Sequence, residues 1–264
     1  MNTIDGTKVW SGITRFIPRS LHEATWPLAI LIVLIGAWEV AIPVLDVPGY
    51  ILPPPSAVAS AFVDHHPTIF DALLVTLQAF AIAFGLTVLT GYVLALAMYE
   101  WTPLEKTVYP YVIAARAIPI VALIPIFVIW FGFGFRSIVI ISYLISVFAM
   151  VVNSLAGFKS TDPKIIEMLD SFSASRWDRF RHVHLYGSMP LVLAGTKICV
   201  ILAFTGVIVG EFLIGTEGIG YLIMSYNSTF DTAPMFAGIV TIAVTQLSLF
   251  GAVVLLERSL ITWR

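Results

Sequence analysis

The chain is poor in the residues on which most soluble and secreted proteins depend. It has a single cysteine, Cys199, so it forms no intrachain disulfide. Only 11% of its 264 residues are charged, whereas charged residues make up roughly a quarter of a typical soluble domain. Instead, 59% of the residues are hydrophobic and the mean hydropathy is +0.95. This balance excludes an ordinary soluble domain and predicts an integral membrane protein.

Signatures of catalysis and of nucleotide binding are absent too. No G-x-x-x-x-G-K-[ST] loop occurs, so the chain has no phosphate cradle for ATP and we expect no cofactor of its own. No G-x-S-x-G elbow occurs either. His65-His66 and His182-x-His184 lack the helical spacing and nearby cysteines of a metal site. With a net charge of −2, we expect no nucleic-acid partner, and the absences favour a conduit over an enzyme.

Six windows are long and apolar enough to cross a bilayer core of roughly 30 Å, which takes about 20 helical residues. They run approximately Trp26–Leu45, Leu73–Met98, Thr107–Trp130, Ser137–Gly157, Met189–Glu211 and Pro234–Leu256. The sequence therefore predicts an all-α integral membrane protein with six transmembrane helices in one domain, residues 26–257. Before the second span, a proline-rich loop leads into a predicted short surface helix at Ala57–Asp64.

Positive charge is distributed unevenly between the two sides of the predicted bundle. Eleven of the fourteen Lys and Arg residues precede the first span, follow the sixth, or lie in the second–third and fourth–fifth connections. The other connections hold only Arg136. Since Lys and Arg near span ends stay on the cytoplasmic side, the N-terminal segment 1–25 and the C-terminal tail 258–264 are both expected in the cytoplasm.

The connection between the fourth and fifth spans, residues 159–188, is the most charged part of the chain. Asp162-Pro163 predicts a helix start, with the carboxylate as cap and proline at the first helical position. Ser175 and Asp178 form a second start resembling a capping box. Two short helices outside the membrane indicate a docking surface for a partner protein. An ordinary solvated loop is the alternative.

This connection also resembles a known motif. The run from Ile166 to Ser175, followed by Trp177, is similar to the EAA loop of permease subunits in binding-protein-dependent ABC importers. In that family the loop contains the coupling helix, which fits a groove on a separate ATPase subunit. The resemblance implies an ATPase-coupling role for six residues: Glu167, Met168, Leu169, Ser173, Ser175 and Trp177. Met168 and Leu169 stand where the family usually has alanines, and Ser173 stands where it has glycine.

The resemblance extends over nearly the whole chain. Four further fragments are similar, in the same order, to nitrate/sulfonate/taurine-type permeases: Ile51–Val58, Ile118–Pro125, Trp130–Gly134, and Gly210-Glu211 with Gly218–Gly220. The resemblance implies a type I importer fold with cytoplasmic coupling helices, in the inner membrane of a bacterium or archaeon. It also implies partners: a second permease copy forming a homodimer, two subunits that bind ATP and magnesium, and an external solute-binding protein.

The resemblance narrows the cargo only to a small solute, such as nitrate, a sulfonate, taurine or another small organic molecule. An ion-coupled secondary carrier and a membrane-embedded enzyme are the alternatives to an importer subunit. An importer should co-purify with an ATPase, whereas neither rival should.

Charges inside the predicted spans point to the path of the solute, because a charge at the bilayer centre costs about 2.5–3.5 kcal/mol on insertion scales. Arg116 either contacts an anionic solute through its fork, or pairs with Glu39 or a backbone carbonyl and holds spans together. Pro119 interrupts the same span, which is tolerated where a cavity is lined or helices pack. Arg116, Pro119 and Glu39 are therefore the candidate pathway residues. Lys197 is expected to reach the membrane interface, and Glu211 to be solvated.

Overall fold

The computed structural model describes residues 21–160, Ser175 and residues 185–261. All regular structure in this part is helical, and its elements are α2 (Leu21–Val44), α3 (Pro55–Glu100), α4 (Thr102–Ala115), the 3-10 turn η2 (Ile120–Leu123), α5 (Ile124–Phe131), α6 (Phe135–Lys159), α9 (Leu185–Ile214), α10 (Ile219–Ser228) and α11 (Thr232–Leu260). Helices α2, α3, α6, α9 and α11 are each long and apolar enough to cross a membrane, and α4 with η2–α5 makes a sixth span if the bent pair is counted as one. The predicted all-α membrane architecture is confirmed.

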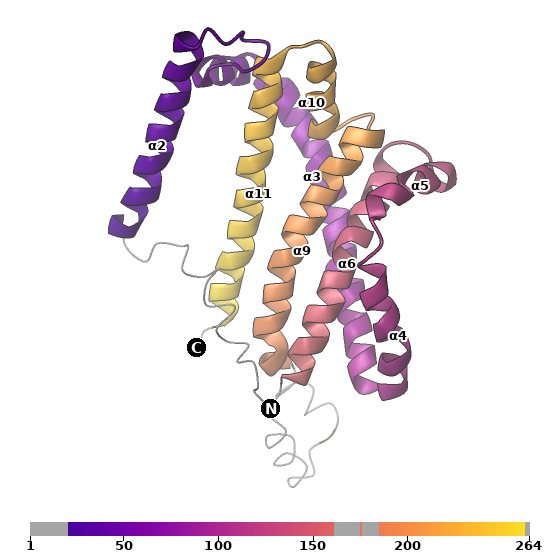
Figure 1. The fold of residues 1–264 in the computed structure, drawn as a ribbon. Helices are drawn as coiled ribbons and strands as arrows, with labels where there is room; N and C mark the ends of the chain where they lie inside the picture. Colours follow the sequence, from indigo (N-terminus) through magenta and orange to yellow (C-terminus); the bar gives the residue numbers. More distant parts are fainter. Residues whose placement is uncertain (1–20, 161–174, 176–184, 262–264) are drawn as a thin grey trace.

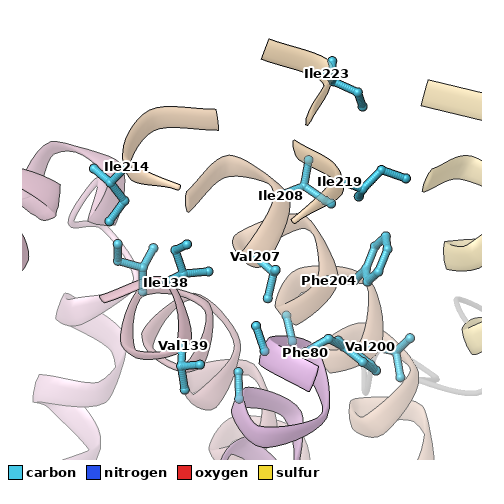
Figure 2. Packing of buried hydrophobic residues seen from close by; sticks show 14 of the residues in the cluster. Phe80, Ile138, Val139, Val200, Phe204, Val207, Ile208, Ile214, Ile219 and Ile223 are labelled. Atoms are coloured by element: carbon cyan, nitrogen blue, oxygen red, sulfur yellow. The ribbon is translucent and has the colours of Figure 1, made fainter. Parts of the chain in front are cut away.

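The core lies where α3, α6 and α9 pack against one another (Figure 1). The most apolar windows of α6 and α9 are 61% buried, whereas those of α2 and α11 are only 6% buried. Figure 2 shows Phe80 of α3 meeting Val200, Phe204 and Val207 of α9 in this core. The rings of Phe80 and Phe204 meet edge to face, with centroids 5.7 Å apart. Helices α2 and α11 therefore turn most of their apolar surface outward.

Glycines allow α6 and α9 to approach closely. A Cβ at Gly206 would lie 2.8 Å from the Cα of Ser142, and one at Gly195 would lie 2.6 Å from the Cβ of Asn153. The Ser142 hydroxyl donates to the Ala203 carbonyl at 2.7 Å across the same interface. Small residues are the usual means of close helix packing in membranes, where lipid offers no hydrophobic driving force. The two helices thus behave as one packed unit.

The third span, predicted over Thr107–Trp130 with an interruption at Pro119, is broken there. Helix α4 ends at Ala115, and the segment Ile120–Phe131 is bent from it by 87°. Pro119 explains the break, because its ring would clash with the Ala115 carbonyl and it has no N–H to donate. Ile118, which precedes it, is pushed away from the helical region for the same steric reason.

The predicted surface helix at Ala57–Asp64 is helical but not separate. It forms the first turns of α3, which continues for 46 residues from Pro55 to Glu100. Figure 1 shows these first turns lying across one end of the bundle before α3 runs down beside α6 and α9. Pro54 and Pro55 begin the helix, where a missing N–H costs no hydrogen bond. Pro67 lies inside α3 without ending it.

The connections gather at two ends of the bundle (Figure 1). The α2–α3 connection, the α5–α6 turn and the α9–α10 loop lie at one end, and the α3–α4 connection lies at the other. The last turn of α6 and the first turn of α9, which border the charged connection 159–188, lie at that second end. The helices predicted within this connection fall outside the described residues.

Candidate functional site

The break in the third span places Arg116 and Pro119 at one exposed corner. Arg116 is the C-cap of α4, with its N–H bonded to the Ile113 carbonyl at 3.2 Å, and Pro119 is the N-cap of η2. Both side chains are exposed, as are the apolar neighbours Ile113, Ile118 and Val121. Over residues 21–160 and 185–261, no carboxylate forms an ion pair with Arg116. The corner is therefore a permanently charged group on an apolar surface.

Glu39 has a different partner from the one that the sequence left open. Its carboxylate accepts from the Ser56 N–H at 3.0 Å and from the Ser56 hydroxyl at 2.7 Å. Ser56 lies in the first turn of α3, where backbone N–H groups have no helical acceptor and the helix dipole favours a negative charge. Glu39 of α2 thus caps α3 and does not pair with Arg116. The signal in the sequence was the Pro-Pro-Pro-Ser helix start, which places a free N–H at Ser56.

Lys197, which was expected to reach the membrane interface, has a carboxylate partner. Its Nζ lies 2.8 Å from Oε2 of Glu257, and the side chains are 11% and 20% exposed. Because α11 continues to Leu260, Glu257 belongs to the helix rather than to a solvated tail. This pair joins α9 to α11 within the bundle. Sixty positions separate the two residues, so no local spacing could have revealed the contact.

A second ion pair lies beside the charged connection. Lys159, in the last turn of α6, pairs with Glu105 in the first turn of α4. A cation at a helix C-terminus and an anion at an N-terminus each complement the helix dipole. The pair thus ties the end of α6 to the start of the broken third span. Of the six residues assigned to ATPase coupling, only Ser175 lies in the described part, where it is exposed. Glu167, Met168, Leu169, Ser173 and Trp177 lie outside it.

Glu211 is buried, contrary to the expectation that it would be solvated. It is 2% exposed, in the last turn of α9. Its carboxylate accepts from the Thr76 hydroxyl, with O–O distances of 2.8 and 3.0 Å, and from the Gly220 N–H at 2.8 Å. The Thr76 oxygen in turn accepts from the Ile219 N–H at 2.9 Å. One buried carboxylate therefore links α9, α3 and the start of α10.

The glycines of the α9–α10 loop are required by this arrangement. Gly218 has a φ of +97°, and a Cβ there would collide with the Glu211 carboxylate. A Cβ at Gly220 would lie 2.7 Å from the Glu211 Cβ. The sequence predicts a tight turn here, but only the structure shows that the turn wraps around a carboxylate.

Two hollows lie away from Arg116. A cavity of about 90 Å³ lies beside the buried carboxylate, lined by Val75, Ala79, Phe135, Ile138, Glu211, Thr216 and Glu217. A groove of about 920 Å³ lies between α2, the first half of α3 and α11, with Trp38, Phe62, Val240 and Val244 among its largely apolar lining. The groove is suited to apolar groups, and neither hollow includes Arg116.

Comparison with known proteins identifies similar chains. The sequence model of the binding-protein-dependent transport system inner membrane component matches residues 66–262. The formylaminopyrimidine transport permease protein ThiX of Halalkalibacterium halodurans is 32% identical over 92% of this chain and 97% of its own length. The riboflavin transport system permease protein RibX of Chloroflexus aurantiacus is 33% identical over 95% and 97%. The taurine transport system permease protein TauC of Escherichia coli is 27% identical over 92% and 90%.

Solved structures share the fold. A chain of the inward-facing MetNI methionine ABC transporter superposes with a TM-score of 0.65 at 16% identity, covering 75% of this chain and 98% of that one. A chain of an amino acid ABC transporter gives a TM-score of 0.61 at 21% identity, covering 75% and 96%. At these identities the likeness concerns the fold alone, and that fold is the type I importer fold that the sequence motifs implied.

Proposed function

We infer that this chain, which belongs to the family of binding-protein-dependent transport system inner membrane components, pairs with a second copy of itself to enclose the path of a small solute. As a family member it is a membrane-spanning permease subunit of an ABC importer, and such subunits act with an ATPase and a solute-binding protein. The pairing, the solute contacts and the orientation are what we propose beyond that.

The observation that carries the proposal is Arg116, which is exposed at the break in the third span and has no ion-pair partner among the described residues. A guanidinium on an apolar membrane surface is costly unless it faces water, a partner or a solute. At the 87° bend the backbone leaves the regular helix and forms turn hydrogen bonds, such as Ile118 N–H to the Ala115 carbonyl at 3.2 Å. Non-helical backbone at membrane depth is tolerated where protein buries it or a cavity is lined. Two copies meeting at this corner would enclose both features. Arg116 and Pro119 then line the path, while Glu39 supports it by holding α3.

The solute that fits this path is a small organic molecule with an anionic group, because a guanidinium binds carboxylate-like and sulfonate-like oxygens in a fork. Relatives named for taurine and aliphatic sulfonates support this class. Uncharged heterocycles are the second candidate, favoured by the 32% and 33% identity to proteins named for formylaminopyrimidine and riboflavin.

ATP and magnesium act on partner subunits, to which the connection 159–188 docks. The support is its position between α6 and α9, whose packed glycine contacts make them one unit. Glu167, Met168, Leu169, Ser173, Ser175 and Trp177 are the proposed contact residues. The connection and the terminal segments 1–25 and 258–264 then face the cytoplasm, and the α9–α10 loop faces outward. The six-span domain 26–257 lies in the inner membrane of a bacterium or archaeon.

Reconstitution tests this proposal. The chain would be purified with its co-eluting subunits and placed in liposomes with the external binding protein, then offered taurine, an alkanesulfonate, formylaminopyrimidine and riboflavin. We expect one class to accumulate only when ATP and the binding protein are both present, and Trp177→Ala to reduce that uptake by weakening the ATPase contact. Full uptake by the permease alone, without ATP, would instead identify an ion-coupled carrier or a channel.

A further inference from the structure

The buried carboxylate at the outward end of α9 has no role in the pathway described above. Glu211 makes no contact with the Arg116 corner, yet it is among the least exposed large side chains of the described residues. Its carboxylate is held by donors from two other elements, Thr76 of α3 and Gly220 of α10. A buried carboxylate is costly when unpaired, so the positions of those donors are strongly specified.

Thr76 makes the arrangement cooperative. Its hydroxyl has one hydrogen, which it donates to Glu211, and its oxygen accepts from the Ile219 N–H. If the loop moved away, Glu211 would lose the Gly220 N–H and the Ile219 N–H would lose Thr76 in the same step. Hydrogen bonds in such chains strengthen one another in a low-dielectric interior. The loop is therefore fastened as a whole or not at all.

The same loop also meets the third span. The Gly134 N–H, in the turn between α5 and α6, donates to the Ile214 carbonyl at 3.0 Å. A Cβ at Gly134 would lie 3.1 Å from Oγ1 of Thr216 in the loop. Helix α5 follows the Arg116–Pro119 break after the short 3-10 turn η2. The fastened loop is thus in contact with the turn that ends the bent span.

Helix α9 connects this end of the molecule to the other. It runs for 30 residues from Leu185 to Ile214, which is about 45 Å at 1.5 Å per residue. Its first residue borders the connection proposed to meet the ATPase, and Glu211 lies in its last turn. Because α9 is packed on α6 through Gly195 and Gly206, it transmits displacement rather than absorbing it.

We propose that Glu211 and Thr76 are positioning residues that fasten the outward α9–α10 loop to the α3–α6–α9 core, so that the loop moves with α9 when the ATPases bind ATP. This deepens the proposed function and rests on it. Glu211 is the acceptor, Thr76 bridges it to the loop, and Gly218 and Gly220 leave room for the carboxylate. ATP binding at one end of α9 then changes the separation of the two outward loops in the paired permease.

Two matched pairs of substitutions separate the hydrogen bonds from the packing. Thr76→Val keeps the shape but removes the bridge, whereas Thr76→Ser keeps the hydroxyl. Glu211→Met keeps the length but accepts nothing. Glu211→Gln keeps the hydrogen bonds. Its amide oxygen can accept from the Gly220 N–H, and its NH₂ can donate to the Thr76 oxygen. The Thr76 hydroxyl then donates to the Ala72 carbonyl, 3.2 Å away. If Glu211 and Thr76 act through these hydrogen bonds, Thr76→Ser and Glu211→Gln should be tolerated, whereas Thr76→Val and Glu211→Met should not.

The measurement is the distance between spin labels attached at Glu217→Cys in the two copies. Glu217 is an exposed residue of the α9–α10 loop. Buried Cys199 remains unlabelled. In the assembled complex, a non-hydrolysable ATP analogue with magnesium should shift this distance in the otherwise native chain and in the Thr76→Ser and Glu211→Gln variants. In the Thr76→Val and Glu211→Met variants the shift should be lost while basal ATP hydrolysis persists. Amide exchange at Ile219 and Gly220 should then rise about tenfold.

Three results would overturn the proposal. The first is no analogue-dependent shift in the otherwise native complex, the second is an unchanged shift in Thr76→Val and Glu211→Met, and the third is equal loss of the shift and of basal ATP hydrolysis. The first result is obtained with the otherwise native chain, so it does not depend on whether a variant folds. A chain that does not assemble with an ATPase, or that shows no ATP-dependent uptake, would refute the proposed function instead.

Discussion

Four charged residues lie within or at the end of the spans predicted from the sequence, and their partners divide them into two groups. Glu39 binds Ser56, Lys197 pairs with Glu257, and Glu211 binds Thr76 and Gly220. Each of these contacts joins two helices. Arg116 has no such contact in the described part of the chain and is exposed. A charge that holds nothing together within one chain is the natural candidate for a role between chains or toward the solute.

Substitution of Arg116 separates those roles. If it binds an anionic solute, Arg116→Gln should lower ATP-dependent uptake by about tenfold to a hundredfold, the value of a hydrogen bond to a charged group. Uptake by the Arg116→Lys variant should lie between that of the native chain and that of Arg116→Gln, because a lysine keeps the charge but not the forked guanidinium. Uptake in liposomes, normalised to assembled complex, is the measurement. Arg136→Gln, at another exposed arginine, is the matched control. Loss of the protein itself from the membrane would indicate a structural role. Unchanged uptake would exclude both the structural role and the solute-binding role.

At the scale of elements, the α6–α9 pair is the unit on which the others depend. It borders the proposed ATPase-docking connection at one end and carries Glu211 at the other. Its close approach depends on glycines that face backbone or Cβ atoms of the partner helix. Helices α2 and α11, by contrast, bury little of their surface within one chain. The tightly packed pair α6–α9 is therefore distinct from the peripheral helices α2 and α11.

Adding one methyl group at the interface tests this rigidity. Gly206→Ala places a Cβ 2.8 Å from the Ser142 backbone, so the helices must separate. Overpacking of this kind costs about 1–3 kcal/mol. Gly85→Ala in α3 is the matched control, because nothing lies within 4 Å of its added Cβ. Thermal unfolding in detergent should show a lower Tm for Gly206→Ala and no loss for Gly85→Ala. Equal effects would mean that the glycine contact does not limit packing.

At the scale of the whole molecule, the connections alternate between two ends of the bundle (Figure 1). The lysines and arginines near span ends concentrate in the terminal segments and in the connections at one of these ends. Orientation in the membrane follows from that bias rather than from the fold, because the bundle itself would pack equally well either way up. The positive-inside rule predicts that the α9–α10 loop faces outward.

Cysteine labelling in intact cells tests the orientation. Thr229→Cys, exposed after α10, should react with a membrane-impermeant maleimide in intact cells. Ser160→Cys, exposed after α6, should react only after permeabilisation. The parent chain is the control, because Cys199 is buried and should not react in either case. Labelling of the Ser160→Cys variant in intact cells would reverse the topology.

The sequence by itself determined the membrane class, the apolar segments and the family, because each rests on local information. Runs of apolar residues fix the spans, and short motifs in a constant order fix the family. The cap signal at Pro54-Pro55-Ser56 was equally local. Even the break at Pro119 was visible as a proline, although its 87° bend was not.

Only the tertiary structure decided what each membrane charge does. Lys197 and Glu257 are 60 positions apart, Thr76 and Glu211 are 135 apart, and each pair meets because separate helices pack together. Such contacts leave no periodic trace in a single chain. Burial was misjudged for Glu211 for the same reason, since its position at a span end indicates solvent until the glycine loop is seen to close over it. Local composition sets which segments enter the membrane, and packing between helices sets which polar groups find partners there.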